Sequence, residues 1–271
     1  MSKEKGAKWE KVWARFALWL VKHCIMPKRE VVRDLPREED EVAVYVCNHS
    51  GAVGPLATAM YMDCKARSWM SYCVTDRKIA PNYIFHDFFF GRQYRCPAFA
   101  RGLAKLVATL LIPLLETQNC VRVYRNDARI FKTFKESVDA LRAGNNLVIF
   151  AESPKPHGKY VNTLYEGIAD LGAFVWKVLK LKLNFYPVYI PPKERILRVG
   201  KPVQYNPDWS TDEARKELPK QIAERIEALG DLVKKHTPIP FLPKAYYRHY
   251  AAEFMECPEA YWQFVAQEYS K

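Results

Sequence analysis

Apolar residues along the chain follow two patterns, one typical of buried strands and the other of amphipathic helices. Val42–Cys47, Leu147–Phe150 and Phe185–Ile190 are short and almost continuously apolar, which predicts strands covered on both faces. Ile130–Arg142 instead repeats apolar residues at helical spacing, and Gly144 follows as the expected end of that helix. The apolar face of this helix is predicted to contain Phe131, Phe134, Val138 and Leu141.

Strand-like and helix-like segments alternate as far as Val199, which predicts an α/β fold with a central, mostly parallel or mixed sheet flanked by helices. A further helix is expected over Val161–Leu179, and the capping-box pair Ser210 and Glu213 predicts the start of another. We expect three parts: an N-terminal amphipathic, membrane-associating helix in 1–30, the α/β domain in 31–237, and an aromatic-rich helical C-terminal extension in 238–271.

The N-terminal segment Lys8–Met26 predicts an amphipathic helix, because Trp9, Trp13 and Phe16 recur at helical spacing and most basic residues fall outside that stripe. Tryptophan and lysine on one helix suit the interface of an anionic bilayer. The same stripe would also suit packing on the protein's own core, and both alternatives stay open. Leu103–Leu115 is apolar on nearly all sides, which predicts a buried helix or part of a hydrophobic groove.

Composition adds a strong basic excess. The 271 residues include 42 Lys and Arg against 30 Asp and Glu, which gives a net charge of +12. Such a charge suits nucleic acid, an anionic membrane surface or phosphorylated substrates, and it also serves general solubility. No nucleic-acid-binding signature accompanies it, so we do not expect nucleic acid as a partner. No apolar run reaches the roughly 20 residues that a spanning helix needs, so membrane spanning is not expected either.

Candidate chemistry lies where the predicted strands end. The sequence lacks the GxSxG, Walker A, GxGxxG and HExxH motifs, and no cluster indicates a metal or redox cofactor. Asn48 and His49 follow the first apolar strand, Arg125 follows a short strand at 121–124, and Glu152 and Lys155 follow the strand ending at 150. The carboxyl ends of parallel strands are where α/β folds place their sites. A general base, two cations and a carboxylate suit acyl transfer to a phosphorylated alcohol.

Four of these segments, read in order, resemble the motifs of a known family. They are NHSGAVGP at 48–55, VRVYR at 121–125, FAESPKP at 150–156 and YPVYI at 186–190. The set is similar to the four blocks of the glycerophospholipid acyltransferases of the 1-acylglycerol-3-phosphate type: NHxxxxD after a strand, a block with an Arg, an FPEGTRS-like block and a VPV-like block. The resemblance covers roughly residues 30–230.

The resemblance implies transfer of a fatty acyl group from acyl-CoA or acyl carrier protein to a hydroxyl of a lysoglycerophospholipid such as 1-acylglycerol-3-phosphate. It implies no cofactor besides the acyl donor, and peripheral attachment to an anionic membrane surface at the cytoplasmic face. His49 would be the general base and Glu152 would belong to the catalytic centre. The residues implied to bind the substrate are Asn48, Arg125, Ser153 and Lys155.

One departure from the family pattern bears directly on catalysis. Gly54 stands where the family has the Asp that orients the imidazole of the motif's His. In the serine-protease triad, losing the corresponding carboxylate lowers kcat about 10⁴-fold. Either another carboxylate or carbonyl orients His49, or the chain keeps the fold as a membrane-associated lipid- or acyl-binding protein with little catalysis. If only the carboxylate is missing, Gly54→Asp should raise the rate. Ala151, Ser153 and Lys155 likewise replace the family's Pro, Gly and Arg.

Overall fold

In the computed structural model, the described residues are 12, 13, 16, 19, 20, 22, 23, 27–38, 41–50, 53–87, 97–124, 128–153, 159–191 and 194–234. Arg125, Lys155 and the expected extension at 238–271 lie outside them. The chain divides into two compact units. Unit 1 comprises Met1–Ile25, Met70–Val123 and Leu242–Lys271, and unit 2 comprises Met26–Trp69 and Tyr124–Phe241.

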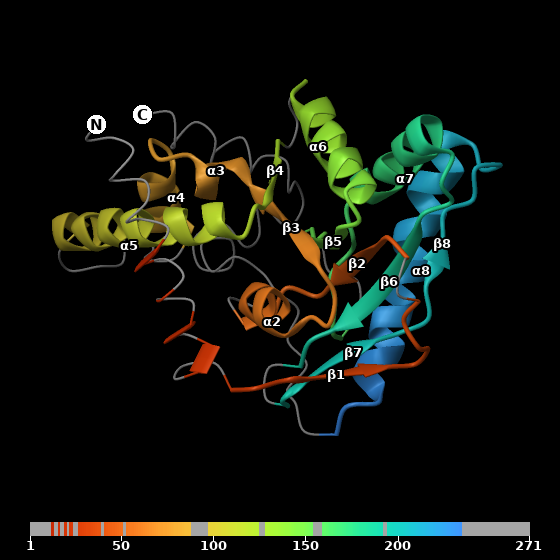
Figure 1. Ribbon diagram of the computed structural model, residues 1–271, viewed down its shortest axis with the longest axis horizontal. Coiled ribbons are helices and arrows are strands. Elements are labelled where there is room, and N and C mark those ends of the chain that lie inside the picture. Colours follow the sequence, from red (N-terminus) through yellow and green to blue (C-terminus); the bar gives the residue numbers. More distant parts are fainter. Residues whose placement is uncertain are drawn as a thin grey trace. The chain divides into compact units, whose positions relative to one another are not determined.

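A mixed, mostly parallel sheet organises the described part of the chain (Figure 1). Its strand order is β1-β7-β6-β2-β5-β3-β4, and β8 pairs with β6. Pairing is antiparallel where β6 meets β7 and β8, and parallel for β2 with β5 and β6. The expected α/β fold is confirmed. The strands are β1 Glu30–Arg33, β2 Ala43–Cys47, β3 Ala66–Ser71, β4 Val121–Val123, β5 Asn146–Ile149, β6 Asn184–Tyr189, β7 Ile196–Val199 and β8 Val203–Gln204.

Strand β2 lies at the centre of this sheet, between β5 and β6. Tyr45 is opposite Val148 on one side and Tyr186 on the other. All five residues of β2 are buried, which explains why this strand is continuously apolar instead of alternating. Because β2, β5 and β6 are parallel, their carboxyl ends lie at the same edge of the sheet.

Helices cover both faces of the sheet in unit 2. Ala57 of α2 packs with alternate residues of β2 (Ala43, Tyr45 and Cys47), and α8 packs on β6 and α7 (Figure 1). The described helices longer than one turn are α2 Val53–Tyr61, α4 Ala80–Asp87, α5 Pro97–Thr117, α6 Ile130–Arg142, α7 Gly167–Leu179 and α8 Thr211–Asp231, and α3 is the single turn Tyr72–Thr75.

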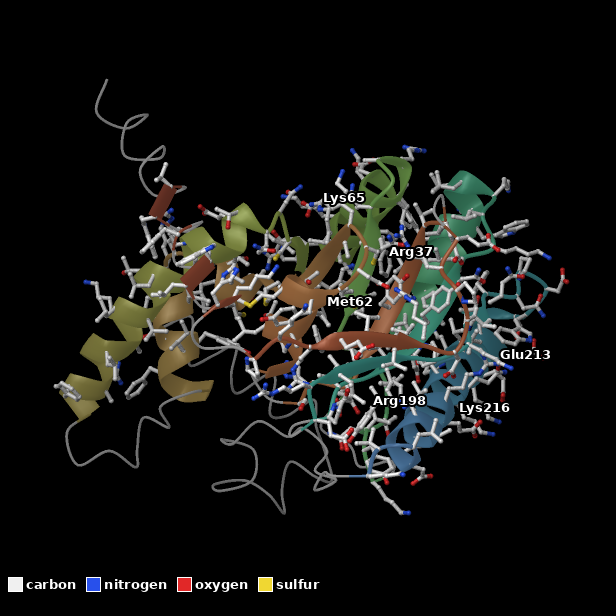
Figure 2. The ribbon with its side chains drawn as sticks, turned by 60° about the horizontal axis from the view of Figure 1, so that its bottom comes forward. Arg37, Met62, Lys65, Arg198, Glu213 and Lys216 are labelled. Atoms are coloured by element: carbon white, nitrogen blue, oxygen red, sulfur yellow. The ribbon has the colours of Figure 1, made fainter. Side chains whose placement is uncertain are left out.

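The structure confirms some predicted helix boundaries and corrects others. Helix α6 has the bounds expected from the sequence, but Phe131 is 66% exposed and does not belong to its buried face. Helix α8 begins with the expected capping box, in which Ser210 and Glu213 each accept a backbone N–H from the other, and Figure 2 shows Glu213 on this helix. Helix α7 starts at Gly167 and not at 161, because Leu164 forms an antiparallel β-bridge with Glu152.

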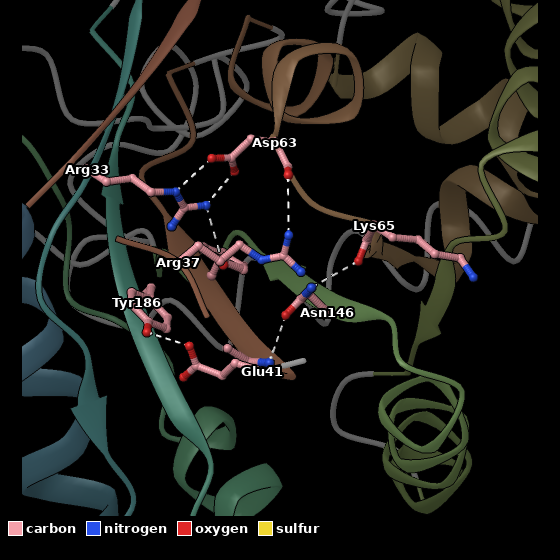
Figure 3. A network of polar contacts seen from close by, with 9 residues as sticks. Arg33, Arg37, Glu41, Asp63, Lys65, Asn146 and Tyr186 are labelled. Atoms are coloured by element: carbon pink, nitrogen blue, oxygen red, sulfur yellow. Dashed lines mark hydrogen bonds and ion pairs between the residues drawn. The ribbon is translucent and has the colours of Figure 1, made fainter. Parts of the chain in front are cut away.

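The amino ends of the central strands are joined by polar side chains (Figure 3). The Glu41 carboxylate accepts hydrogen bonds from Asn184 Nδ2 at 2.6 Å and from the Tyr186 hydroxyl at 2.7 Å. Asn146 Oδ1 accepts the backbone N–H of Ala43 at 2.9 Å. These hydrogen bonds fix the starts of β2, β5 and β6, and they already occupy the polar side chains at this edge that are named above. Of the residues predicted to carry the chemistry, the described ones (Asn48, His49, Glu152 and Ser153) lie at the opposite edge.

Candidate functional site

Asn48 connects the carboxyl ends of β2 and β6. Its Oδ1 accepts the backbone N–H of Ile190 at 2.7 Å, and its Nδ2 donates to the Ile190 carbonyl at 3.3 Å. The side chain is buried, so these two bonds replace the hydrogen bonds to water that the amide loses on folding. Asn48 therefore fixes the position from which His49 leaves the sheet. Its contact with substrate stays a prediction.

His49 and Glu152 meet at the carboxyl edge of the sheet. Glu152 Oε1 accepts the backbone N–H of His49 at 2.5 Å, and Oε2 accepts the backbone N–H of Asn162 at 3.0 Å. The carboxylate is buried, and charged acceptors form the stronger kind of hydrogen bond. The two residues that the sequence marks as catalytic are thus adjacent, and their link joins the backbone of one to the side chain of the other.

The imidazole of His49 packs against an aromatic side chain from the third block. The ring centroids of His49 and Phe150 are 5.2 Å apart, with an angle of 57° between the ring planes. Ser50 then adopts a φ of 44°, in the left-handed region that residues other than glycine seldom occupy. This turn ends β2 abruptly, and α2 begins at Val53.

Gly54 approaches the His49 backbone more closely than any other residue type could. An ideal β-carbon at position 54 would lie 2.2 Å from the His49 carbonyl oxygen and 3.2 Å from that of Asn48. Both neighbours are backbone atoms, which cannot rotate away as a side chain can. With this backbone, position 54 therefore has no room for the Asp side chain of the family motif. Gly54 differs from that motif in the space the backbone leaves, as well as in the missing carboxylate.

The segment after the third block forms a bridge to the strand end that carries Glu152. Glu152 and Leu164 form an antiparallel β-bridge. Ser153 N–H donates to the Thr163 carbonyl at 2.8 Å, and Tyr165 N–H donates to the Ala151 carbonyl at 2.8 Å. These bonds hold Ser153 in a buried position beside Glu152 and explain why helix α7 cannot start at 161.

Helix α8 fixes this segment from the other side through Glu227. Its carboxylate accepts three consecutive backbone N–H groups, with distances of 3.0, 2.9 and 2.9 Å. The Tyr160 hydroxyl also donates to Asp231 at 2.9 Å, and the absence of a side chain at Gly230 allows the Tyr160 ring to lie close to the helix. The three donors are the backbone amides of Lys159, Tyr160 and Val161.

Two carboxylates therefore link α8 to the predicted general base. Glu227 binds residues 159–161, the next amide (Asn162) binds Glu152, and Glu152 binds the backbone of His49. The sequence alone indicated Glu152 but gave no sign of Glu227, because α8 lies far from both partners along the chain and its carboxylates follow an ordinary exposed-helix pattern. The remaining predicted residues, Arg125 and Lys155, lie outside the described part of the chain.

Among the described residues, no group of three or more His, Cys, Asp or Glu side chains is arranged to hold a metal ion. Comparison with known proteins adds no assignment: no family model matches the chain, and no curated protein is significantly similar to it.

Proposed function

We propose that this chain is an acyltransferase-like protein of lipid metabolism at the cytoplasmic face of a membrane. It would transfer a fatty acyl group from acyl-CoA or acyl carrier protein to a hydroxyl of a lysoglycerophospholipid such as 1-acylglycerol-3-phosphate. The observation that carries the proposal is the hydrogen bond from the His49 backbone to Glu152, because it joins the first and third motif blocks at the carboxyl edge of the sheet.

In the proposed reaction His49 accepts the proton of the acceptor hydroxyl while the oxygen attacks the thioester carbonyl. The C–O bond forms, the C–S bond breaks, and the departing thiolate takes the proton back from the imidazolium. Atoms and electrons balance without an oxidant or a metal. A positioned general base typically contributes about 10²- to 10⁴-fold to such a step. Arg125 and Lys155 would bind the acceptor phosphate through charge-assisted hydrogen bonds.

A second candidate function is supported by the close approach of Gly54 to the His49 carbonyl. If no other group orients the imidazole, the fold would serve as a membrane-associated lipid- or acyl-binding protein with little catalysis. The two candidates use the same fold and the same strand-end site, and they differ in turnover.

An acyl-transfer assay tests the first candidate. Full-length protein is supplied with acyl-CoA and acyl carrier protein donors and with lysophosphatidic acid and other lysolipids, and products are read by mass spectrometry. His49→Ala is compared with His86→Ala, a histidine of α4 to which the proposal gives no role. Transfer that falls by about 10²-fold or more in His49→Ala alone supports the enzyme.

The same assay can support the second candidate instead. If folded wild-type protein transfers no more acyl groups than His49→Ala but still binds acyl chains, a binding protein is the better reading. Acyl binding is measured separately, by competition with a fluorescent fatty acid, so that each protein gives a result in both assays. Equal turnover in the wild type and in His49→Ala would contradict a base role for His49.

A further inference from the structure

Helix α5 has two apolar faces on opposite sides. One face packs within unit 1 against helix α4, where small residues allow close contact. This buried cluster joins Ala80, Ile84 and Phe85 of α4 to four residues of α5 that recur every fourth position: Ala100, Ala104, Ala108 and Ile112. One side of α5 is therefore fully occupied by protein.

The opposite face of α5 is open. Phe99 is 69% exposed, Leu106 is 55% exposed and Leu110 is 45% exposed, with Leu103 half-buried between them. At 100° per residue these four positions fall within one narrow stripe, directed away from the alanine face. We call Phe99, Leu103, Leu106 and Leu110 the α5 stripe. Single exposed leucines are common on soluble proteins, but an aligned row of large apolar side chains indicates a binding surface.

The charged residues of α5 lie away from the α5 stripe. At 100° per residue, Arg101 and Lys105 fall on the side of the helix that carries the alanines, and the Arg101 guanidinium lies over the Phe85 ring of α4, 4.6 Å from its centroid. The acidic residue of α5, Glu116, is near its end. The stripe itself is therefore uncharged, and attraction to a negative headgroup layer would come from the net charge of the chain, +12.

Contrary to the expectation from the sequence that no apolar segment is long enough, Ala98–Thr117 is, by length and composition, the one helix in the described residues that could cross a membrane, with a mean hydropathy of 1.7. Only 28% of this apolar window is buried. A helix that crosses a bilayer alone presents lipid on all sides, whereas α5 has one face packed on α4. An apolar stripe opposite a protein-covered face fits a helix that lies in the plane of the interface.

The same unit exposes a second set of apolar residues near the N-terminus. Val12, Phe16, Trp19 and Leu20 are all exposed, and the Phe16 and Trp19 rings stack with centroids 6.1 Å apart. Their spacing again corresponds to one side of a helix. Two exposed apolar rows in unit 1, together with a net charge of +12, favour a membrane over a soluble protein partner.

We propose that the α5 stripe inserts into the interface of an anionic phospholipid bilayer, with α5 parallel to the surface and its alanine face directed toward the protein. The α5 stripe would provide the membrane association that the proposed function includes, and the inference rests on the proposed function only for that association. Lipid binding is measured without substrate, so a protein that transfers no acyl group could still bind through α5, and the two proposals can fail separately.

The test is co-sedimentation of the full-length protein with vesicles of phosphatidylcholine containing phosphatidylglycerol, and with vesicles of phosphatidylcholine alone. The variant Leu106→Glu/Leu110→Glu, and each of its two single substitutions, are compared with Phe131→Glu, which places one such charge at an exposed apolar residue of α6. If the circular dichroism of the Glu variant differs from that of the wild type, the uncharged pair Leu106→Gln/Leu110→Gln is used in its place.

We expect the α5 variant to lose at least tenfold in partitioning to anionic vesicles, and Phe131→Glu to keep wild-type binding. Wild-type binding by a folded α5 variant would overturn the proposal. So would a wild-type dimer in lipid-free solution, seen by light scattering, that becomes monomeric in the α5 variant, since a second copy would then cover the stripe. An equal loss in Phe131→Glu would also overturn it, because the effect would then be one of net charge.

Discussion

The carbonyl oxygen of His49 occupies the space that a β-carbon would need at Gly54, 2.2 Å from its ideal position. The first turn of α2 thus lies directly against the residue proposed as the general base. The Asp of the NHxxxxD pattern would need this space for its β-carbon, and the backbone here does not leave it.

Gly54→Asp should consequently lower stability and should not raise acyl transfer, contrary to what the motif alone predicts. Forcing a side chain against fixed backbone typically costs about 1–3 kcal/mol. Denaturant unfolding of Gly54→Ala and Gly54→Asp measures the change. Gly102→Ala is the matched control: nothing lies within 4 Å of its ideal β-carbon, so it should gain about 0.5–1 kcal/mol from helix propensity. A Gly54→Ala protein as stable as the wild type would contradict the close approach.

Glu227→Gln should loosen the segment that carries the partner amide of Glu152. The neutral amide keeps one acceptor oxygen for the three N–H groups that now share two, and a part-buried N–H group left unpaired costs up to about 1–3 kcal/mol. Hydrogen exchange at residues 159–162 should become faster, with a smaller effect on β2. Glu224→Gln, at an exposed position of the same helix, should leave exchange unchanged. Equal protection in both variants would show that Glu227 does not hold this segment.

Acid should weaken the contact between Arg33 and Asp63. The Arg33 guanidinium donates from Nε to Asp63 Oδ2 at 2.8 Å, and this bond lowers the pKa of the Asp63 carboxyl. A depressed pKa stabilises the folded chain above the unfolded value of about 3.9, and that contribution disappears as pH falls through the folded value. Because Asp63 is partly exposed, we expect less than about 1 kcal/mol.

Unfolding curves between neutral pH and about pH 3 measure this contribution, since that interval includes the unfolded pKa of an aspartate. Asp63→Asn should flatten the acid limb of stability against pH. Asp139→Asn, which removes a longer and more exposed surface contact with Arg142, is the control. Identical slopes for the wild type and Asp63→Asn would rule out the contribution.

Alkali should unfold the chain before its central tyrosines ionise. Burial raises the pKa of Tyr45 to about 12 and also raises those of Tyr186 and Tyr189. A raised pKa contributes stability below the unfolded value of about 10, and that stability is lost as pH rises toward the folded value. Tyrosinate absorbance from these residues should therefore appear together with the loss of circular dichroism. Ionisation of all tyrosines in a still-folded protein would contradict their burial.

Much of the central sheet could be read from the sequence, because β2, β5 and β6 are buried on both faces and so are continuously apolar. The edge strand β1 (EVVR) and the strand β3 (ARSWMS) could not, since they are only partly buried and carry no clear repeat. The start of α7 at Gly167 could not be predicted for a related reason. The segment before it is held by the Glu227 carboxylate, which is distant in the sequence, and not by its own composition.

The candidate site was predictable to the same extent. Strand ends placed His49 and Glu152 at one edge, and the structure does bring them together. The kind of contact between them could not be predicted, because every residue except proline has a backbone N–H and the sequence does not show which one donates. Nor was the reason for Gly54, because the approach of the His49 carbonyl is a property of the folded backbone and not of either residue.

The central position of β2 has a consequence for how the chain acquires its structure during synthesis. Its neighbours are β5 and β6, where Val44 pairs with Leu147 and Phe185, so both partners leave the ribosome long after β2 itself. Until β5 and β6 have been synthesised, the nascent chain therefore exposes five apolar residues with unpaired backbone groups, and non-local parallel pairing is slow to form. Chaperone dependence of expression should follow from this strand order, and a rearranged gene that encodes β2 directly before β5 should reduce it.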